Sequence, residues 1–198
     1  SNPNFIHITQ LFADERIIKN SFDNLDTLNE QSLFAGFLVK FSPQGDKLIM
    51  NHHAYKFKFF DFDNSNGEVT KLFDLELDKE LNYGIRGRFD FSQDGTKFYT
   101  QSGYQKHIIH QFDLKNWGDK DYFLNSMKII WSSESSCADC LFWEFQLAPN
   151  NRLYIKYLYN YTGRKDSTFL GVINCPNSDA PYVGYQHLGL SLTDKRIN

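Results

Sequence analysis

Residues 41–50 read FSPQGDKLIM, and residues 91–100 read FSQDGTKFYT. The match extends beyond these ten positions, because FFDFD (59–63) falls on IHQFD (109–113) at the same spacing. Alignment of the two stretches superposes four identical pairs: Phe41 on Phe91, Ser42 on Ser92, Gly45 on Gly95, and Lys47 on Lys97. Self-similarity at a fixed period is the signature of a repeat architecture, and the period decides the fold.

A third copy begins at FQLAPNNRLYIKYL (145–158) and ends at FLGVINC (169–175). Its LAPNN (147–151) takes the place of the FSPQG of the first copy. The third copy is slightly longer, and the polar stretch 160–166 can house its extra residues.

Each copy has the same internal order of strands and turns. Alternating apolar residues before the turn predict a strand with one buried face, and Pro, Asp, Asn and Gly then predict a tight turn. Second strands are expected at 47–52, 96–101 and 152–158. A third strand ends at FFDFD (59–63) in the first copy and at IHQFD (109–113) in the second. In the first copy, Asn66-Gly67 then predicts a type I′ hairpin leading into a fourth strand at 68–77. In the second copy the corresponding connection, 115–126, is longer and precedes the fourth strand at 127–131.

Four short antiparallel strands in about 50 residues are typical of a β-propeller blade. The sequence therefore predicts an all-β fold with three blades, at about 36–80, 84–135 and 141–193. Residues 1–35 are expected to be N-terminal strands and a linker, with 5–12 as part of a preceding blade and 22–34 as a helix or a loop. Because propellers close with about four to eight blades, a partial propeller or a fragment of a longer one is expected.

Composition and charge narrow the classes of partner. Hydrophobic residues make up 41% of the 198 residues, which is enough for a packed core. With a net charge of −3, the chain lacks the excess of Lys and Arg with which nucleic-acid binders neutralise phosphates. The longest apolar run, 33–39, is too short to span a bilayer, so we expect neither nucleic-acid binding nor membrane insertion.

The blade motifs also resemble a known family. FSPQGDKLIM, FSQDGTKFYTQSG, HQFDL (110–114), FQLAPNNRLYI (145–155), FLGVINCPN (169–177) and LGLSLTDKRIN (188–198) look like the WD40-like, YVTN-type propeller repeats of Bacteroidetes secreted and surface proteins. The resemblance covers roughly residues 36–198. It implies a propeller in an exported protein, at the cell surface, in the periplasm or secreted, and Ser1-Asn2 looks like a remnant of tag cleavage that would have replaced a leader. It carries no shared catalytic motif.

Tyrosines near predicted loops are the candidate ligand contacts. They are Tyr157, Tyr159, Tyr161, Tyr182 and Tyr185. An amphipathic ring near a loop can bind a sugar or a peptide, although packing between sheets explains many aromatic residues in strands.

The cysteines and the acidic residues give no catalytic or metal motif. Cys137 and Cys140 are candidates for a local disulfide, with Cys175 left buried as a small hydrophobe. DFDNSNGEVTKL (61–72) fails as an EF-hand because Asn66 stands where glycine is needed. Asp90 and Glu144 lie in first strands, but Lys40 takes the equivalent place in another copy, so no catalytic, cofactor or metal residue is expected.

The sequence thus leaves more than one function open. The first expectation is a non-catalytic propeller module that binds protein or glycan, or serves as a scaffold or spacer. The alternative is a propeller hydrolase or lyase with carboxylates at the axial funnel. Expected partners are a protein or carbohydrate ligand and the missing blades, supplied by a longer chain or an oligomeric partner.

Overall fold

Each copy of the repeat forms one four-stranded antiparallel sheet in the computed structural model, which describes residues 38–52, 56–77, 85–102, 107–133, 140–159 and 169–192. The first sheet contains β1 (Leu38–Phe41), β2 (Lys47–His52), β3 (Lys56–Asp63) and β4 (Glu68–Glu76). The second contains β5 (Ile85–Phe91), β6 (Lys97–Ser102), β7 (Ile108–Asp113) and β8 (Lys128–Ser132). The third contains β9 (Cys140–Leu147), β10 (Leu153–Tyr159), β11 (Phe169–Ile173) and β12 (Tyr185–Ser191). The all-β prediction and the four-strand unit are confirmed.

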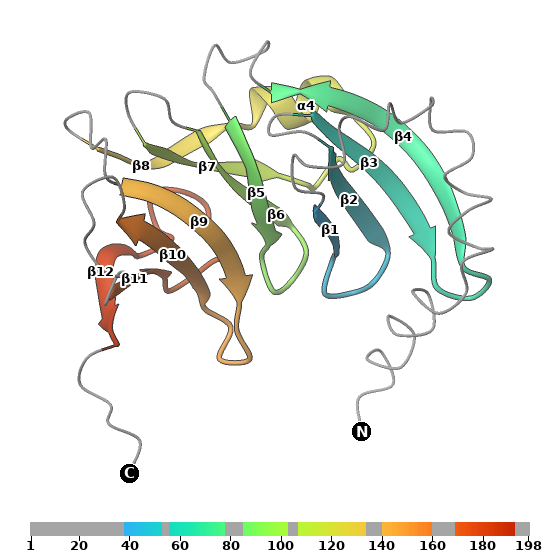
Figure 1. Cartoon of the computed structure of the whole chain (residues 1–198). Helices are drawn as coiled ribbons and strands as arrows, with labels where there is room; N and C mark the ends of the chain where they lie inside the picture. The colour runs from blue at the N-terminus through green and yellow to red at the C-terminus, as the bar shows by residue number, and fades with distance from the viewer. Residues whose placement is uncertain are drawn as a thin grey trace.

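The three sheets lie side by side through their first strands (Figure 1), with β5 between β1 and β9. Within each sheet the strands follow chain order, so β1, β5 and β9 are edge strands that meet one another. The sheets do not close into a ring within the described residues.

Two apolar clusters hold neighbouring sheets together. Between the first and second sheets, Phe57 and Phe59 pack with Phe89 and Phe98, all fully buried. Between the second and third sheets, Tyr99 packs with a second group of buried residues: Ile109, Phe145, Leu153, Ile155, Ile173 and Val183. Because Phe98 and Tyr99 are adjacent on β6, they point to opposite faces and each joins a different cluster.

The turn between the first and second strands explains the repeated glycine. Gly45 has φ +72° and Gly95 has φ +66°, a left-handed conformation that glycine adopts without steric cost. In the third copy Asn151 takes this place with φ 61°, and asparagine is among the few other residues that tolerate it. The same hydrogen bond closes each turn, from the backbone N–H of these residues to the carbonyl oxygen three positions earlier.

The repeated serine has an equally local cause. The Ser92 hydroxyl is buried, accepts from the backbone N–H of Lys97 at 2.9 Å and donates to Asp94 Oδ1 at 2.6 Å. The Ser42 hydroxyl makes the equivalent bonds to Lys47 N–H and Asp46 Oδ1. Each serine therefore ties the end of the first strand to the start of the second.

The hairpin at Asn66-Gly67 differs from the expected type I′ turn. Gly67 has φ +77°, but Asn66 is not among the described residues with positive φ, and a type I′ turn needs both. Asp63 Oδ1 accepts from Ser65 N–H and the Gly67 N–H donates to the Asp63 carbonyl, so four residues, 64–67, form the loop. The aspartate side chain competes with the backbone here and selects the longer loop.

The longer connection of the second copy contains a short helix that the sequence did not predict. Helix α4 (Lys120–Asn125) begins after Asp119, whose side chain accepts from Tyr122 N–H at 2.8 Å. Phe123 is buried and stacks on Phe112 with ring centroids 4.5 Å apart, so the insertion completes the core between the first and second sheets.

The expected N-terminal strand at 5–12 and the candidate helix at 22–34 lie outside the described residues. Among the described helices, none has the length and apolar character that crossing a bilayer requires.

We expect Ser92→Ala to lower the free energy of unfolding by about 1–3 kcal/mol, because the Lys97 N–H loses a buried acceptor. Ala148→Ser is the matched control at the same place of the third copy, and it should change stability little, since that turn closes without a hydroxyl. Urea unfolding measures both. Equal stabilities of the parent and Ser92→Ala would contradict this account.

Candidate functional site

An ion pair joins the first strands of all three sheets. Lys40 Nζ on β1 donates to Asp90 Oδ2 on β5 at 2.6 Å and to the carbonyl oxygen of Phe145 on β9 at 2.8 Å. Asp90 also accepts from the N–H of Leu147 at 3.0 Å and from its neighbour Phe91. The side chains of Lys40 and Asp90 are 17% and 9% exposed, so the pair is largely desolvated.

The two partners differ in what they leave free. Asp90 receives three donors, which fix the orientation of its carboxylate. An ammonium has three N–H groups and Lys40 donates two of them to the described residues, so the third is available to another acceptor. Glu144 directly precedes Phe145 on β9 and is exposed. The Lys40 ammonium thus reaches the backbone of β9 one residue from a strand position that carries a carboxylate.

From the sequence alone, no shared site is predicted at Lys40 and Asp90, because the residue at this position varies from copy to copy. The structure shows that the variation is complementary: a cation in one copy faces an anion in the next. Opposite charges at one aligned position, directly before Phe41 and Phe91, were the signal that was missed.

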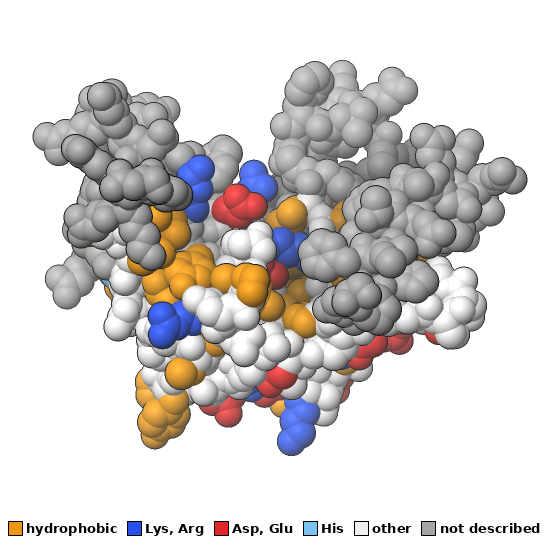
Figure 2. Space-filling view, turned by 90° about the horizontal axis from the view of Figure 1, so that it is seen from below, with side chains coloured by type: hydrophobic (Ala, Val, Ile, Leu, Met, Phe, Trp, Pro, Cys, Tyr) orange, Lys and Arg blue, Asp and Glu red, His pale blue; other side chains and the backbone are white. Residues whose placement is uncertain are grey.

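The outer surface carries charges of both signs. In the face seen in Figure 2, acidic and basic side chains lie among hydrophobic and uncharged ones, and neither sign forms a continuous patch among the described residues.

A buried serine–histidine pair lies between β6 and β7. Ser102 Oγ and His110 Nε2 are 2.7 Å apart, and both side chains are almost fully buried. Burial lowers the pKa of His110 to about 4, so the imidazole is neutral at pH 7. His107, three residues earlier, is also buried, and the pair lies inside the second sheet, away from any surface that the described residues leave open.

The predicted ligand tyrosines are in different surroundings. Tyr182 is 79% exposed in the connection before β12, while Tyr185 is half-buried and its ring lies 5.9 Å from that of Trp131. Tyr157 and Tyr159 belong to β10 by backbone pairing, but their side chains, and all of Tyr161, lie outside the described residues.

Cys137 and the side chain of Cys140 likewise lie outside the described residues, so the proposed disulfide stays a prediction. Cys175 is a free cysteine and is exposed, which contradicts the expectation that it is buried. Cys175 lies in the connection after β11, where its N–H donates to the Val183 carbonyl, and Val183 rather than Cys175 belongs to the buried cluster. No cluster of three or more metal-ligating side chains occurs among the residues that the structure describes.

Comparison with known proteins adds the following findings. No model of a protein family matches the chain, and no curated protein sequence matches it. Similar solved structures include a candidate 6-phosphogluconolactonase from Bacteroides fragilis, with a TM-score of 0.46 and 13% identity over 70% of this chain and 34% of the other.

Two further structures are similar at the same level. A periplasmic gluconolactonase from Pseudomonas aeruginosa has a TM-score of 0.40 and 16% identity over 70% of this chain and 35% of its own. A β-propeller domain from Myceliophteria thermophila has a TM-score of 0.40 and 12% identity over 68% of this chain and 38% of its own. The chain therefore spans about a third of the length of these structures.

These findings correct the first expectation about function. A non-catalytic module for protein or glycan binding is contradicted, because gluconolactonases, which are hydrolases, stand among the similar structures. The alternative expectation, a propeller hydrolase, agrees with them better.

We expect Asp90→Ala to lower the free energy of unfolding by about 3 kcal/mol, because it leaves the Lys40 ammonium and two backbone N–H groups without their acceptor. Lys40→Met should cost less, since Asp90 keeps its two backbone donors. Asp74→Ala, which breaks the exposed Lys71–Asp74 pair, is the control and should change stability by less than about 0.5 kcal/mol. A larger loss of unfolding free energy for Lys40→Met than for Asp90→Ala in chemical denaturation would contradict the assignment.

His110 should make stability depend on pH. Its folded pKa of about 4 lies below the ordinary value of 6.5, so between these values the unfolded chain binds more protons than the folded chain. Stability should therefore fall as the pH drops from 6.5 to 4, by roughly 3 kcal/mol from this residue. In His110→Gln this share of the pH dependence should vanish, as unfolding titrations at several pH values can show. If the unfolding free energy of His110→Gln depends on pH as strongly as that of the parent, this role of His110 is refuted.

Proposed function

We propose that this chain provides three blades of a larger β-propeller hydrolase that cleaves small esters, including cyclic ones. The observation that carries the proposal is the contact of the Lys40–Asp90 pair with the backbone of β9 at Phe145, the residue next to the exposed Glu144. First strands surround the axis of a propeller, and ligands bind at the mouths of such closed β architectures.

Each residue has a separate role in the proposed reaction. Glu144 is the general base: it takes a proton from water while the water oxygen attacks the carbonyl carbon of the ester. The free N–H of Lys40 stabilises the negative charge that develops on the carbonyl oxygen. When the C–O bond breaks, the protonated Glu144 returns the proton to the leaving alkoxide oxygen. Asp90 is a positioning residue, because its three donors hold it where it orients the Lys40 ammonium.

The propeller itself is part of the proposal. Three four-stranded sheets that meet through their first strands support the interpretation of each sheet as a blade, over about 36–80, 84–135 and 141–193. Further blades would come from a longer chain or from a partner. The blade motifs support membership of the WD40-like Bacteroidetes repeats, and with it export from the cytoplasm.

The test uses the natural protein that contains this chain. Hydrolysis of gluconolactone and 6-phosphogluconolactone, the substrates in the names of similar structures, is followed with spontaneous hydrolysis subtracted. Glu144→Gln should lower kcat by about 100-fold or more, as expected for loss of a general base. Glu68→Gln, an exposed carboxylate at the start of outer strand β4, is the matched control and should leave kcat unchanged.

Two outcomes would overturn the proposal. One is hydrolysis of either lactone by Glu144→Gln at the parent rate. The other is a natural protein that accelerates neither lactone nor simple aryl esters over the uncatalysed reaction.

A further inference from the structure

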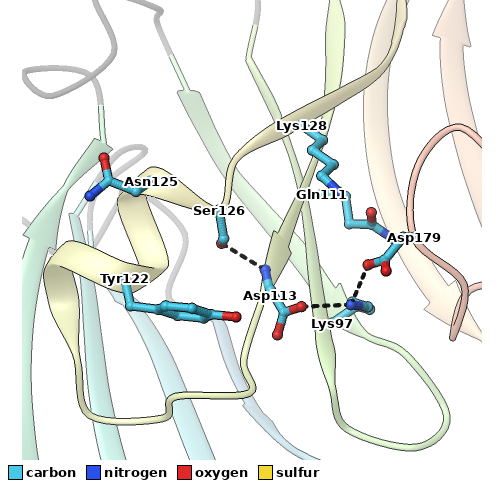
Figure 3. A pocket seen from close by; sticks show the side chains of 8 residues that line it. All are labelled: Lys97, Gln111, Asp113, Tyr122, Asn125, Ser126, Lys128 and Asp179. Carbon is cyan, nitrogen blue, oxygen red and sulfur yellow. Dashed lines mark hydrogen bonds and ion pairs between the residues drawn. The ribbon is translucent and has the colours of Figure 1, made fainter.

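A pocket of about 250 Å³ opens between the second sheet and the third, away from the first strands (Figure 3). Its walls come from β6, β7, the α4 segment, β8 and the connection between β11 and β12. The lining side chains are all polar: Lys97, Gln111, Asp113, Tyr122, Asn125, Ser126, Lys128 and Asp179.

Lys97 is the fixed centre of the pocket. Its Nζ lies 2.8 Å from Asp113 Oδ2 and 2.6 Å from Asp179 Oδ1, and its side chain is only 8% exposed. Burial alone would lower the pKa of Lys97, but the hydrogen bonds and charges of the two carboxylates outweigh it and raise the pKa. The lysine therefore stays charged at neutral pH, between two anions.

A second cation balances the two carboxylates. Lys128 on β8 extends toward Asp179 (Figure 3), and its charge helps to lower the pKa of that carboxyl, after the larger effects of Lys97. Two lysines and two aspartates give the pocket a net charge of zero. An anion entering it would meet two carboxylates, and a cation would meet two ammonium groups. The charges thus disfavour a charged ligand of either sign.

From this arrangement we infer that the pocket binds a neutral, hydroxyl-rich small molecule about the size of one sugar ring. A hydroxyl group both donates and accepts, so it can bond to a carboxylate and to an ammonium in the same pocket. Asp179 Oδ2 makes no hydrogen bond with any described residue, and neither does the Lys128 ammonium, so both are available to such a ligand.

Aromatic and size constraints agree with this ligand class. Tyr122 is half-buried and presents its ring and hydroxyl beside Asp113 (Figure 3), where the ring can contact the C–H face of a sugar. The volume is below the roughly 300–1,000 Å³ that drug-sized ligands need, so it admits a single ring and no glycan chain.

The rest of the pocket is rigid enough to be preformed. The Gln111 side chain donates to Tyr99 Oη and to the Ser178 carbonyl, both at 2.7 Å, and accepts from Ala180 N–H. These bonds hold the connection that carries Asp179 against the second sheet. None of the residues proposed for ester hydrolysis lines the pocket, so this inference stands apart from the proposed function.

The test measures binding to the 198-residue chain. Ligand-observed NMR and calorimetry are run with glucose, galactose and myo-inositol, and in parallel with glucose 6-phosphate and glucosamine. At least one neutral compound should bind with Kd on the order of 1 mM, more tightly than both charged analogues. Asp179→Asn and Tyr122→Ala should each weaken that binding about tenfold or more. Asp121→Asn, an exposed residue of the same helix outside the pocket, is the matched control and should not change it.

Asp179 is 61% exposed and Lys97 keeps Asp113, so Asp179→Asn should fold, and thermal unfolding of each variant verifies it. Equal binding in the parent and in both pocket variants would overturn the inference. So would tighter binding of glucose 6-phosphate than of glucose, or no binding of any neutral compound at 50-fold above the expected Kd.

Discussion

Burial of both faces of the first and second sheets is the constraint on which this structure depends. The first sheet directs Phe57 and Phe59 to one face and Phe60 and Phe62 to the other, and all four are buried. The second sheet does the same with Phe98 and Tyr99. A sheet that is apolar on both sides cannot be stable in water alone, because each face must lie against another layer. Side-by-side stacking follows, and it brings the edge strands β1, β5 and β9 together.

Once those strands meet, their charged residues must be paired. Lys40 and Asp90 lie where the sheets converge and water is scarce, and an unpaired charge there would carry a large desolvation penalty. The ion pair with its backbone partners removes that penalty and also fixes the spacing of three strands. The same arrangement brings one Lys40 N–H to the strand that also carries the exposed Glu144, which makes a structural requirement a candidate for chemistry.

Features that depend on neighbours in the chain could be predicted from the sequence. The turn at Gly45 and Gly95, the strand after it and the serine before it are set within six residues, and all were visible as repeated letters. The length of the hairpin at 64–67 was missed because the Asp63 side chain, rather than the Asn-Gly pair, determines it. Helix α4 was missed because six residues contain too little periodicity to recognise.

The candidate sites required information that lies far apart in the chain. Lys40 and Asp90 are 50 residues apart, and Lys97 and Asp179 are 82 residues apart. Nothing local in the sequence indicates such partners; only the stacking of whole sheets brings them within bonding distance. Position-by-position comparison of adjacent copies, with attention to opposite charges, would have found the first pair but not the second, since Asp179 lies in the connection between third and fourth strands, which differs in length and sequence from copy to copy.

The chain-order pairing of the strands also determines how the molecule can assemble. Every ladder joins strands that are consecutive in sequence, so each sheet can form by successive hairpins, without waiting for a distant segment. Contacts between sheets come second, and they close the larger loops whose entropy must be overcome. Each sheet is thus a kinetic unit as well as a repeated one. A gene that gains or loses one copy changes the number of such units without changing the strand order within any other sheet.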